Sequence, residues 1–122
     1  MNRIAFITLL AVPALTLIGC ATPAAMRERV AQQEITSKKS AQMVAMCIAD
    51  RWENLGVFGG TVPVNMRPIQ NGYSVSWRNP STSHTGLMVD VTDQMHGSKT
   101  KYYKNVVIGE GAFDNAVVEC QQ

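Results

Sequence analysis

The chain has 122 residues, which leaves room for one small folded domain. It carries eleven Lys and Arg against nine Asp and Glu, for a net charge of +2, and Lys38-Lys39 is the only adjacent pair of like charge. Because nucleic-acid binding needs a clustered basic face, this balance argues against nucleic acid as a partner.

The first residues have the composition of an export signal. Arg3 lies in a short cationic head, and residues 4–18 contain no charged residue. At ~1.5 Å per residue, a helix of about fifteen residues is shorter than the ~30 Å hydrocarbon layer of a membrane. The pattern therefore predicts a signal peptide rather than a membrane-spanning helix.

The end of this stretch, Leu17-Ile18-Gly19-Cys20, resembles the lipobox of bacterial lipoproteins. A Leu lies three positions before the Cys, and the small Gly19 gives a peptidase access to the backbone. The resemblance implies cleavage before Cys20, a diacylglyceryl thioether on its thiol that palmitate would label, and a further acyl chain on the freed amine. Two or three acyl chains anchor a protein stably. The alternative is an ordinary secretory signal followed by an accidental Cys.

Position 21 is Ala rather than Asp, which in lipoproteins of Gram-negative bacteria implies transfer to the outer membrane. The resemblance thus predicts a lipid-anchored protein of the cell envelope that faces the periplasm. We divide the chain into a signal peptide at 1–19, a lipidated Cys and tether at 20–36, and one small domain at 37–122.

Cys47 and Cys120 remain once Cys20 is assigned to the lipid. Disulfides persist in an oxidising compartment such as the periplasm, so we expect a Cys47–Cys120 disulfide. Two buried free thiols are the alternative. A zinc site is disfavoured because neither a CxxC nor an HxxxH spacing is present.

A helix is expected after a cap at Ser37 or Ser40, with Gly56 at its end. Its apolar stripe recurs at steps of three and four residues and includes Val44, Cys47, Ile48 and Leu55. A second helix closes the chain, with a stripe of Phe113, Ala116, Val117 and Cys120. Both cysteines therefore lie on faces that point into the core.

Three or four strands are expected between these helices. Residues 61–69 contain Pro63 and Pro68, which is typical of an edge strand or an irregular one. Asn71-Gly72 predicts a hairpin turn, and a last strand spans 99–107. Large residues that alternate with polar ones are expected to face the core: Tyr73, Val75, Trp77, Leu87, Val89 and Val91.

The predicted fold class is α+β. It consists of an N-terminal helix, a three- to four-stranded antiparallel meander and a C-terminal helix on the same sheet face, with the helices linked by the disulfide. The helices are expected to cover the sheet through Val44, Ile48, Phe113 and Val117.

Candidate catalytic residues are few. The loop and strand that contain Ser81, Ser83, His84 and Asp90 supply the residue types of a nucleophilic triad. No Gly-x-Ser-x-Gly elbow accompanies them, and Ser-rich loops are ordinary turn material. Asp90 and Asp93 face opposite ways on one strand and its turn, which argues against a glycosidase carboxylate pair. We therefore expect no catalytic residue.

Metal binding is also weakly indicated. Seven Met and two His in an envelope protein suggest copper, which favours thioether and imidazole ligands. Met43 and Met46 fit a helix that packs and Met88 fits a strand, however, and only Met95-His96 is expected as an exposed pair. We expect no metal and no cofactor.

The residues expected to contact a partner lie in loops and on the outer sheet face: Arg78, His84, His96, Lys101 and Tyr102. The predicted function is a non-enzymatic, membrane-anchored module that binds an envelope protein. One alternative is an inhibitor or immunity-type lipoprotein that acts against a lytic enzyme. Another is a small periplasmic hydrolase, which would need a deep cleft with converging titratable groups.

Overall fold

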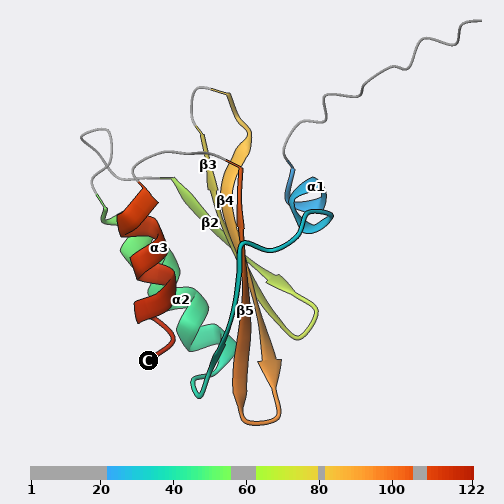
Figure 1. Ribbon diagram of the computed structural model, residues 1–122, viewed down its shortest axis with the longest axis vertical. Helices are drawn as coiled ribbons and strands as arrows, with labels where there is room; N and C mark the ends of the chain where they lie inside the picture. Colours follow the sequence, from blue (N-terminus) through green and yellow to red (C-terminus); the bar gives the residue numbers. More distant parts are fainter. Residues whose placement is uncertain (1–21, 56–62, 80–81, 106–109) are drawn as a thin grey trace, which may run out of the picture.

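The computed structural model describes residues 22–55, 63–79, 82–105 and 110–122. The predicted signal peptide, Cys20, Gly56 and Ser81 lie outside these ranges. In chain order the elements are α1 (Pro23–Arg27), β1 (Gln33–Ser37), α2 (Ala41–Glu53), β2 (Val64–Ile69), β3 (Gly72–Arg78), β4 (Thr85–Gln94), β5 (Gly97–Lys104) and α3 (Glu110–Glu119) (Figure 1).

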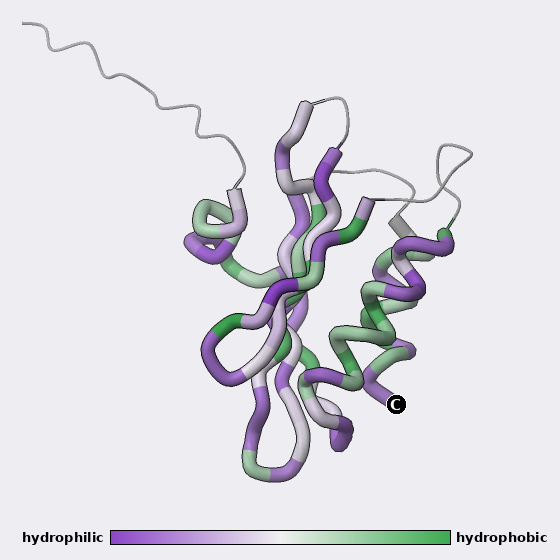
Figure 2. The backbone as a smooth tube through the Cα atoms, turned by 180° about the vertical axis from the view of Figure 1, so that it is seen from behind, coloured by the Kyte–Doolittle hydropathy of each residue, from purple (hydrophilic) through white to green (hydrophobic). Residues whose placement is uncertain are grey.

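The strands form one antiparallel sheet in the order β1-β5-β4-β3-β2. The last four strands are the predicted meander, and β2, which contains Pro68, lies at the edge. Helices α2 and α3 lie on one face of the sheet and α1 lies on the other (Figures 1 and 2). The α+β class is confirmed, and the sheet has five strands rather than three or four.

Strand β1 is one of two elements that the sequence pattern missed, and helix α1 is the other. Ile35 is the one large apolar residue of β1, and it packs against the core on the helix side. Glu34 faces the other way and pairs in register with Lys101 of β5. A strand with a single apolar contact gives almost no periodic signal, because it is stabilised by pairing with a distant segment.

Helix α2 begins at the predicted Ser40 cap, whose Oγ accepts a hydrogen bond from the Met43 amide at 3.3 Å. The Asp93 Oδ1 accepts a second one from the Ala41 amide at 2.9 Å, which ties the helix start to the end of β4. The residues that α2 buries are Ala41, Val44, Ala45, Ile48 and Trp52. Met43 and Met46 were predicted to pack; their exposed fractions are 59% and 54%, so this prediction is wrong.

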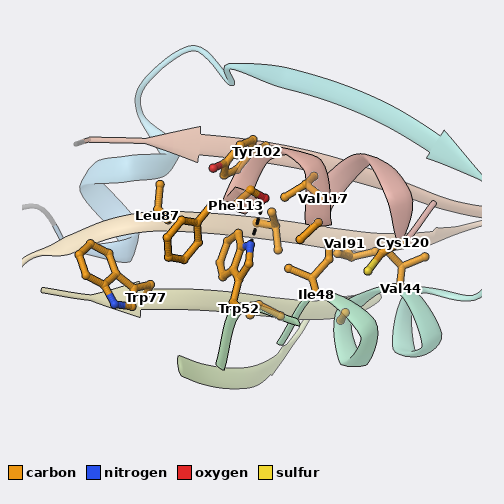
Figure 3. Close-up of a cluster of buried hydrophobic side chains, with 14 of the residues drawn as sticks. Val44, Ile48, Trp52, Trp77, Leu87, Val91, Tyr102, Phe113, Val117 and Cys120 are labelled. Atoms are coloured by element: carbon orange, nitrogen blue, oxygen red, sulfur yellow. Dashed lines mark hydrogen bonds between the residues drawn. The ribbon is translucent and has the colours of Figure 1, made fainter. Parts of the chain in front are cut away.

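The main core fills the space between α2, α3 and the sheet (Figure 3). At its centre the Trp52 Nε1 donates a hydrogen bond to the Phe113 carbonyl at 3.2 Å. The Trp52 ring lies 5.9 Å from that of Phe113 and 6.1 Å from that of Tyr102, measured between centroids. The inward positions predicted for the alternating strand residues and for both helices are confirmed.

The Cys47–Cys120 disulfide is present, with 5.8 Å between the two Cα atoms. It joins α2 to the residue that follows α3, over a sequence separation of 73. The two helices of the covering layer are thereby linked covalently as well as through the core.

A second, smaller core lies on the opposite sheet face. Met26 of α1 packs there with Met88 and Tyr103, and Ala31 is partly buried beside them. Strand β4 is consequently buried on both faces over most of its length, whereas its alternation predicted one buried face. The tether predicted for 20–36 is, from Thr22 onward, folded onto the sheet as α1 and β1.

The residues of α1 and β1 that precede residue 37 therefore belong to the same folded unit as the rest of the described chain, together with both clusters of buried residues. Within the ranges that the structure describes, no helix is long and apolar enough to cross a membrane.

The disulfide is expected to contribute a large part of the free energy of unfolding. Replacing both Cys47 and Cys120 by Ala should lower the free energy of unfolding by about 4 kcal/mol in the chain-entropy model, because a long loop is no longer closed in the unfolded chain. Urea unfolding of the variant and the wild type measures the difference. Stoichiometric alkylation of both thiols in the native protein without reductant would show that the bond does not form.

Candidate binding surfaces

The residues predicted to contact a partner do not form one site. Arg78 ends β3 and His84 directly precedes β4, so both lie at one end of the sheet. His96 lies in the turn between β4 and β5, at the opposite end (Figure 1). Lys101 lies within β5 on the face turned away from α2 and α3, where it approaches Glu34 at 3.8 Å. One partner would have to span the domain to touch all four.

Tyr102 was predicted on the outer face, and the structure contradicts this. Its side chain is 1% exposed and belongs to the main core. Its hydroxyl donates a hydrogen bond to the Asp114 Oδ1 at 2.9 Å, and Lys104 pairs with the same carboxylate at 3.1 Å. Tyr102 therefore fastens α3 to the sheet instead of facing a partner.

The candidate catalytic residues are also separated. The Asp90 carboxylate forms an ion pair with Arg27, whereas Asp93 faces the other way and caps α2. Six positions along an extended strand, from His84 to Asp90, span roughly 20 Å. In the part of the chain that the structure describes, no group of three or more His, Cys, Asp or Glu could hold a metal ion.

The end of the sheet at the β4–β5 turn carries a wide groove of about 700 Å³, which we call the distal groove. Three segments enclose it: the β1–α2 connection, the β4–β5 turn and the last residues of the chain. Its lining residues are Thr36, Ser37, Lys38, Lys39, Gln94, Met95, His96, Gln121 and Gln122. Among these described residues there are two lysines and no carboxylate side chain, so the groove favours an acidic partner.

The β4–β5 turn is short and rigid. Gln94 pairs with Gly97, so Met95 and His96 alone form the turn. Gly97 has φ +135°, and a Cβ there would lie 1.9 Å from the Ser37 carbonyl oxygen, so only glycine fits. The turn presents Met95 with 91% of its side chain exposed. The predicted exposure of the Met95-His96 pair at a hairpin tip is therefore confirmed.

Hydrogen bonds fix the other walls of the distal groove. Ser37 Oγ donates to the Gln121 carbonyl and accepts from the Lys39 amide. The Gln121 side chain, 7% exposed, donates to the Val117 carbonyl at 2.9 Å and accepts from Thr100 Oγ1 at 3.2 Å. A buried Gln with both ends satisfied holds the end of the chain in place. No pattern in the sequence indicates this role of Gln121.

A second groove, of about 320 Å³, lies on the outer face between α1, β2 and β3. We call it the arginine groove, because three arginines line it. The full set of lining residues is Pro23, Arg27, Asn65, Arg67, Pro68, Ile69, Ser74, Ser76 and Arg78. Of the predicted partner-binding residues, Arg78 alone belongs to it.

Arg27 holds α1 onto the sheet at this groove. Its Nε and Nη2 bind the two Asp90 carboxylate oxygens at 2.7 and 3.0 Å, and Nη2 also donates to Ser74 Oγ at 3.2 Å. The hydrogen bonds to Asp90 raise the pKa of the Arg27 guanidinium. Burial beside them, followed by the negative charge of Asp90, raises the pKa of the Tyr103 phenol.

Sequence reasoning missed this ion pair because 63 residues separate its partners. The available signal was Asp90 itself, a carboxylate in the middle of a strand rich in Val, Leu and Met. A charge at such a position is rarely buried unless it is paired.

The other charges of the outer face differ in how they are paired. Glu34 lies 3.3 Å from Lys99 and 3.8 Å from Lys101, so one carboxylate serves both lysines. Arg67 and Arg78 are exposed, and no carboxylate among the described residues pairs with either. The arginine groove therefore has two uncompensated positive charges.

Comparisons with protein-family models, with curated proteins and with solved structures found no match to this chain. The geometry and chemistry of the two grooves therefore carry the functional argument.

The Arg27–Asp90 pair predicts unequal effects of its two substitutions. Arg27→Met should lower the free energy of unfolding by about 2 kcal/mol, because it leaves a carboxylate that is only 11% exposed without its donor. Asp90→Asn should cost only about 1 kcal/mol, because the amide oxygen still accepts and Arg27, 38% exposed, reaches water. Urea unfolding measures both values.

The matched control is Arg51→Met, which breaks an exposed pair with Glu119. It should cost less than about 1 kcal/mol, as surface ion pairs do. If Arg27→Met lowers the free energy of unfolding by no more than this control does, the ion pair does not hold α1 on the sheet.

Proposed function

We propose that this chain is a lipid-anchored protein of the bacterial cell envelope, that the lipid is on Cys20, and that the domain binds a protein partner through the distal groove without catalysing a reaction. The observation that carries the proposal is the exposed Met95 beside a cationic groove with rigid walls. The lipobox-like residues before Cys20 support the anchor.

The position of the distal groove suits a membrane-anchored binder. The strand residue that binds α1 is Asp90, five residues before Met95, which corresponds to roughly 17 Å along β4. Helix α1 and the β4–β5 turn accordingly lie toward different ends of the domain (Figure 1). An anchor that precedes α1 would leave the distal groove open to the periplasm.

The chemistry of the distal groove indicates what it would recognise. Met is unbranched and polarisable, and it adapts to apolar pockets of varied shape. Lys38 and Lys39 flank it with positive charge. A fitting partner therefore offers a small apolar pocket with acidic residues at its rim. Complementary charges of this kind mainly increase the association rate and the specificity.

The positions of the titratable side chains suit a binding function better than a catalytic one. His96 is the one imidazole among the residues that line the distal groove, and Lys38 and Lys39 are the charged side chains beside it. His84 lies at the other end of the sheet, and Asp90 is engaged by Arg27. A periplasmic hydrolase would need these groups to converge. An inhibitor of a lytic enzyme is one form that the proposed binding could take.

The anchor is tested by the Cys20→Ser precursor. It should lose palmitate labelling and move from the membrane fraction to the soluble fraction, because the hydroxyl is too weak a nucleophile to replace the thiol. Fractionation with metabolic labelling measures both. Should the variant stay labelled and membrane-bound, the anchor lies elsewhere in the chain.

The distal groove is tested with a photo-crosslinker at Met95 in the intact envelope. It should trap a protein neighbour, and Met95→Asp should weaken binding of that protein roughly tenfold, as loss of a central apolar contact does. The control is Met43, exposed on α2 and of the same type, where neither crosslinking nor Met43→Asp should have an effect.

Equal trapping from both positions would contradict the assignment of the distal groove. A purified domain that cleaves peptidoglycan or an ester, and loses this activity on His84→Ala, would replace binding by hydrolysis as the function. A trapped lytic enzyme that regains activity with Met95→Asp would identify the inhibitor case.

A further inference from the structure

We propose that the arginine groove binds the phosphate groups of anionic phospholipids, so that the domain lies with its outer sheet face against the membrane. This inference rests on the proposed lipid at Cys20, and it adds an orientation and a lipid preference to that anchor.

The first argument is charge. Arg67 and Arg78 extend from the outer face of β2 and β3, and neither has a carboxylate partner within the described ranges. Guanidinium groups are weakly hydrated and bind phosphate oxygens through two parallel hydrogen bonds. The residues between them, Asn65, Ser74 and Ser76, add polar side chains that can donate to phosphate.

The second argument is the spacing of the two arginines. Arg67 pairs in register with Ser74, and Arg78 lies four residues farther along β3. Four residues of strand correspond to ~13 Å, so the two side chains are placed to reach separate phosphates. A membrane surface offers many phosphates at once, whereas one free phosphate would meet only one of the arginines.

The third argument is the position of the anchor. Pro23 and Arg27 of α1 line the same groove. Cys20 precedes Thr22, the cap of α1, by two residues, so their Cα atoms are at most about 7 Å apart. Acyl chains at Cys20 would therefore enter the bilayer beside the groove. Lipid headgroups, rather than a protein, are the neighbours that this geometry supplies.

The ion pair between Arg27 and Asp90 gives the orientation its rigidity. Because it holds α1 on the sheet, Thr22, two positions after the proposed anchor, has a fixed place beside the outer sheet face. The arginines and the lipid then act together, since an acyl chain combined with a basic patch binds membranes more firmly than either alone.

The test uses the chain from residue 20 to 122 with Cys20→Ser, which contains the whole described domain and no lipid. Its binding to phosphatidylglycerol vesicles is compared with binding to phosphatidylcholine vesicles by co-sedimentation at low salt. We expect the wild type to bind the anionic vesicles only. Each arginine should contribute about fivefold to the affinity, so the double variant Arg67→Gln, Arg78→Gln should bind about 30-fold more weakly. Added salt should weaken the binding of the wild type to the anionic vesicles, because it screens the charges.

The matched control combines Lys38→Gln with Lys39→Gln, which removes the same charge from the distal groove. It should leave vesicle binding within twofold of the wild type, and thermal melting should be unchanged in both double variants. An equal loss in the two variants would show that net charge, and not the arginine groove, determines binding.

Three further results would overturn the proposal. The first is no binding to anionic vesicles at low salt. The second is complete release of the domain from the vesicles by millimolar inorganic phosphate at constant ionic strength, which indicates a site for a free anion. The third is a crosslinker at Arg67 that traps a protein in the envelope. Because the vesicle test needs no lipid on the protein, its failure is distinguishable from a failure of the Cys20→Ser fractionation.

Discussion

The buried carboxylate of Asp90 is the constraint from which much of the arrangement follows. It lies in a central strand covered on both faces, where an unpaired charge would be costly. Arg27 satisfies it, and Arg27 can do so only if α1 lies on the outer face of the sheet. That contact in turn covers Met88 and Tyr103 and brings α1 beside the arginine groove. One long-range ion pair thus connects the packing of the sheet to the position of a membrane anchor.

The helix layer depends on a different set of contacts. Trp52 lies between Phe113 and Tyr102, and the disulfide joins the same two helices farther along. Asp114 then binds Tyr102 and Lys104 of β5, so α3 is attached to both α2 and the sheet. These contacts also place Gln121, which forms part of the distal groove. The groove is thus an extension of the core, which explains how a small domain can present a rigid binding surface.

Local periodicity predicted the elements that bury a continuous stripe. Helices α2 and α3, the meander and the inward cysteines were all expected from steps of two, three or four residues. Strand β1 and helix α1 were not, because each contributes one large apolar side chain whose partner is distant in sequence. Tyr102 and Tyr103 show a different limit. They are adjacent and face opposite ways, and both are buried because β5 is covered on both faces. Alternation alone cannot tell which of two neighbouring aromatic residues faces the main core.

The contact between Gly97 and Ser37 has a consequence for how such a surface can evolve. A side chain at position 97 would collide with the backbone of β1, so this position is closed to change. Met95 and His96 are exposed, and the described structure gives neither a packing role in a core. The shape of the turn is therefore maintained by one residue, while the side chains that it displays are free to vary. A lineage could exchange one partner for another at these two positions with little loss of stability.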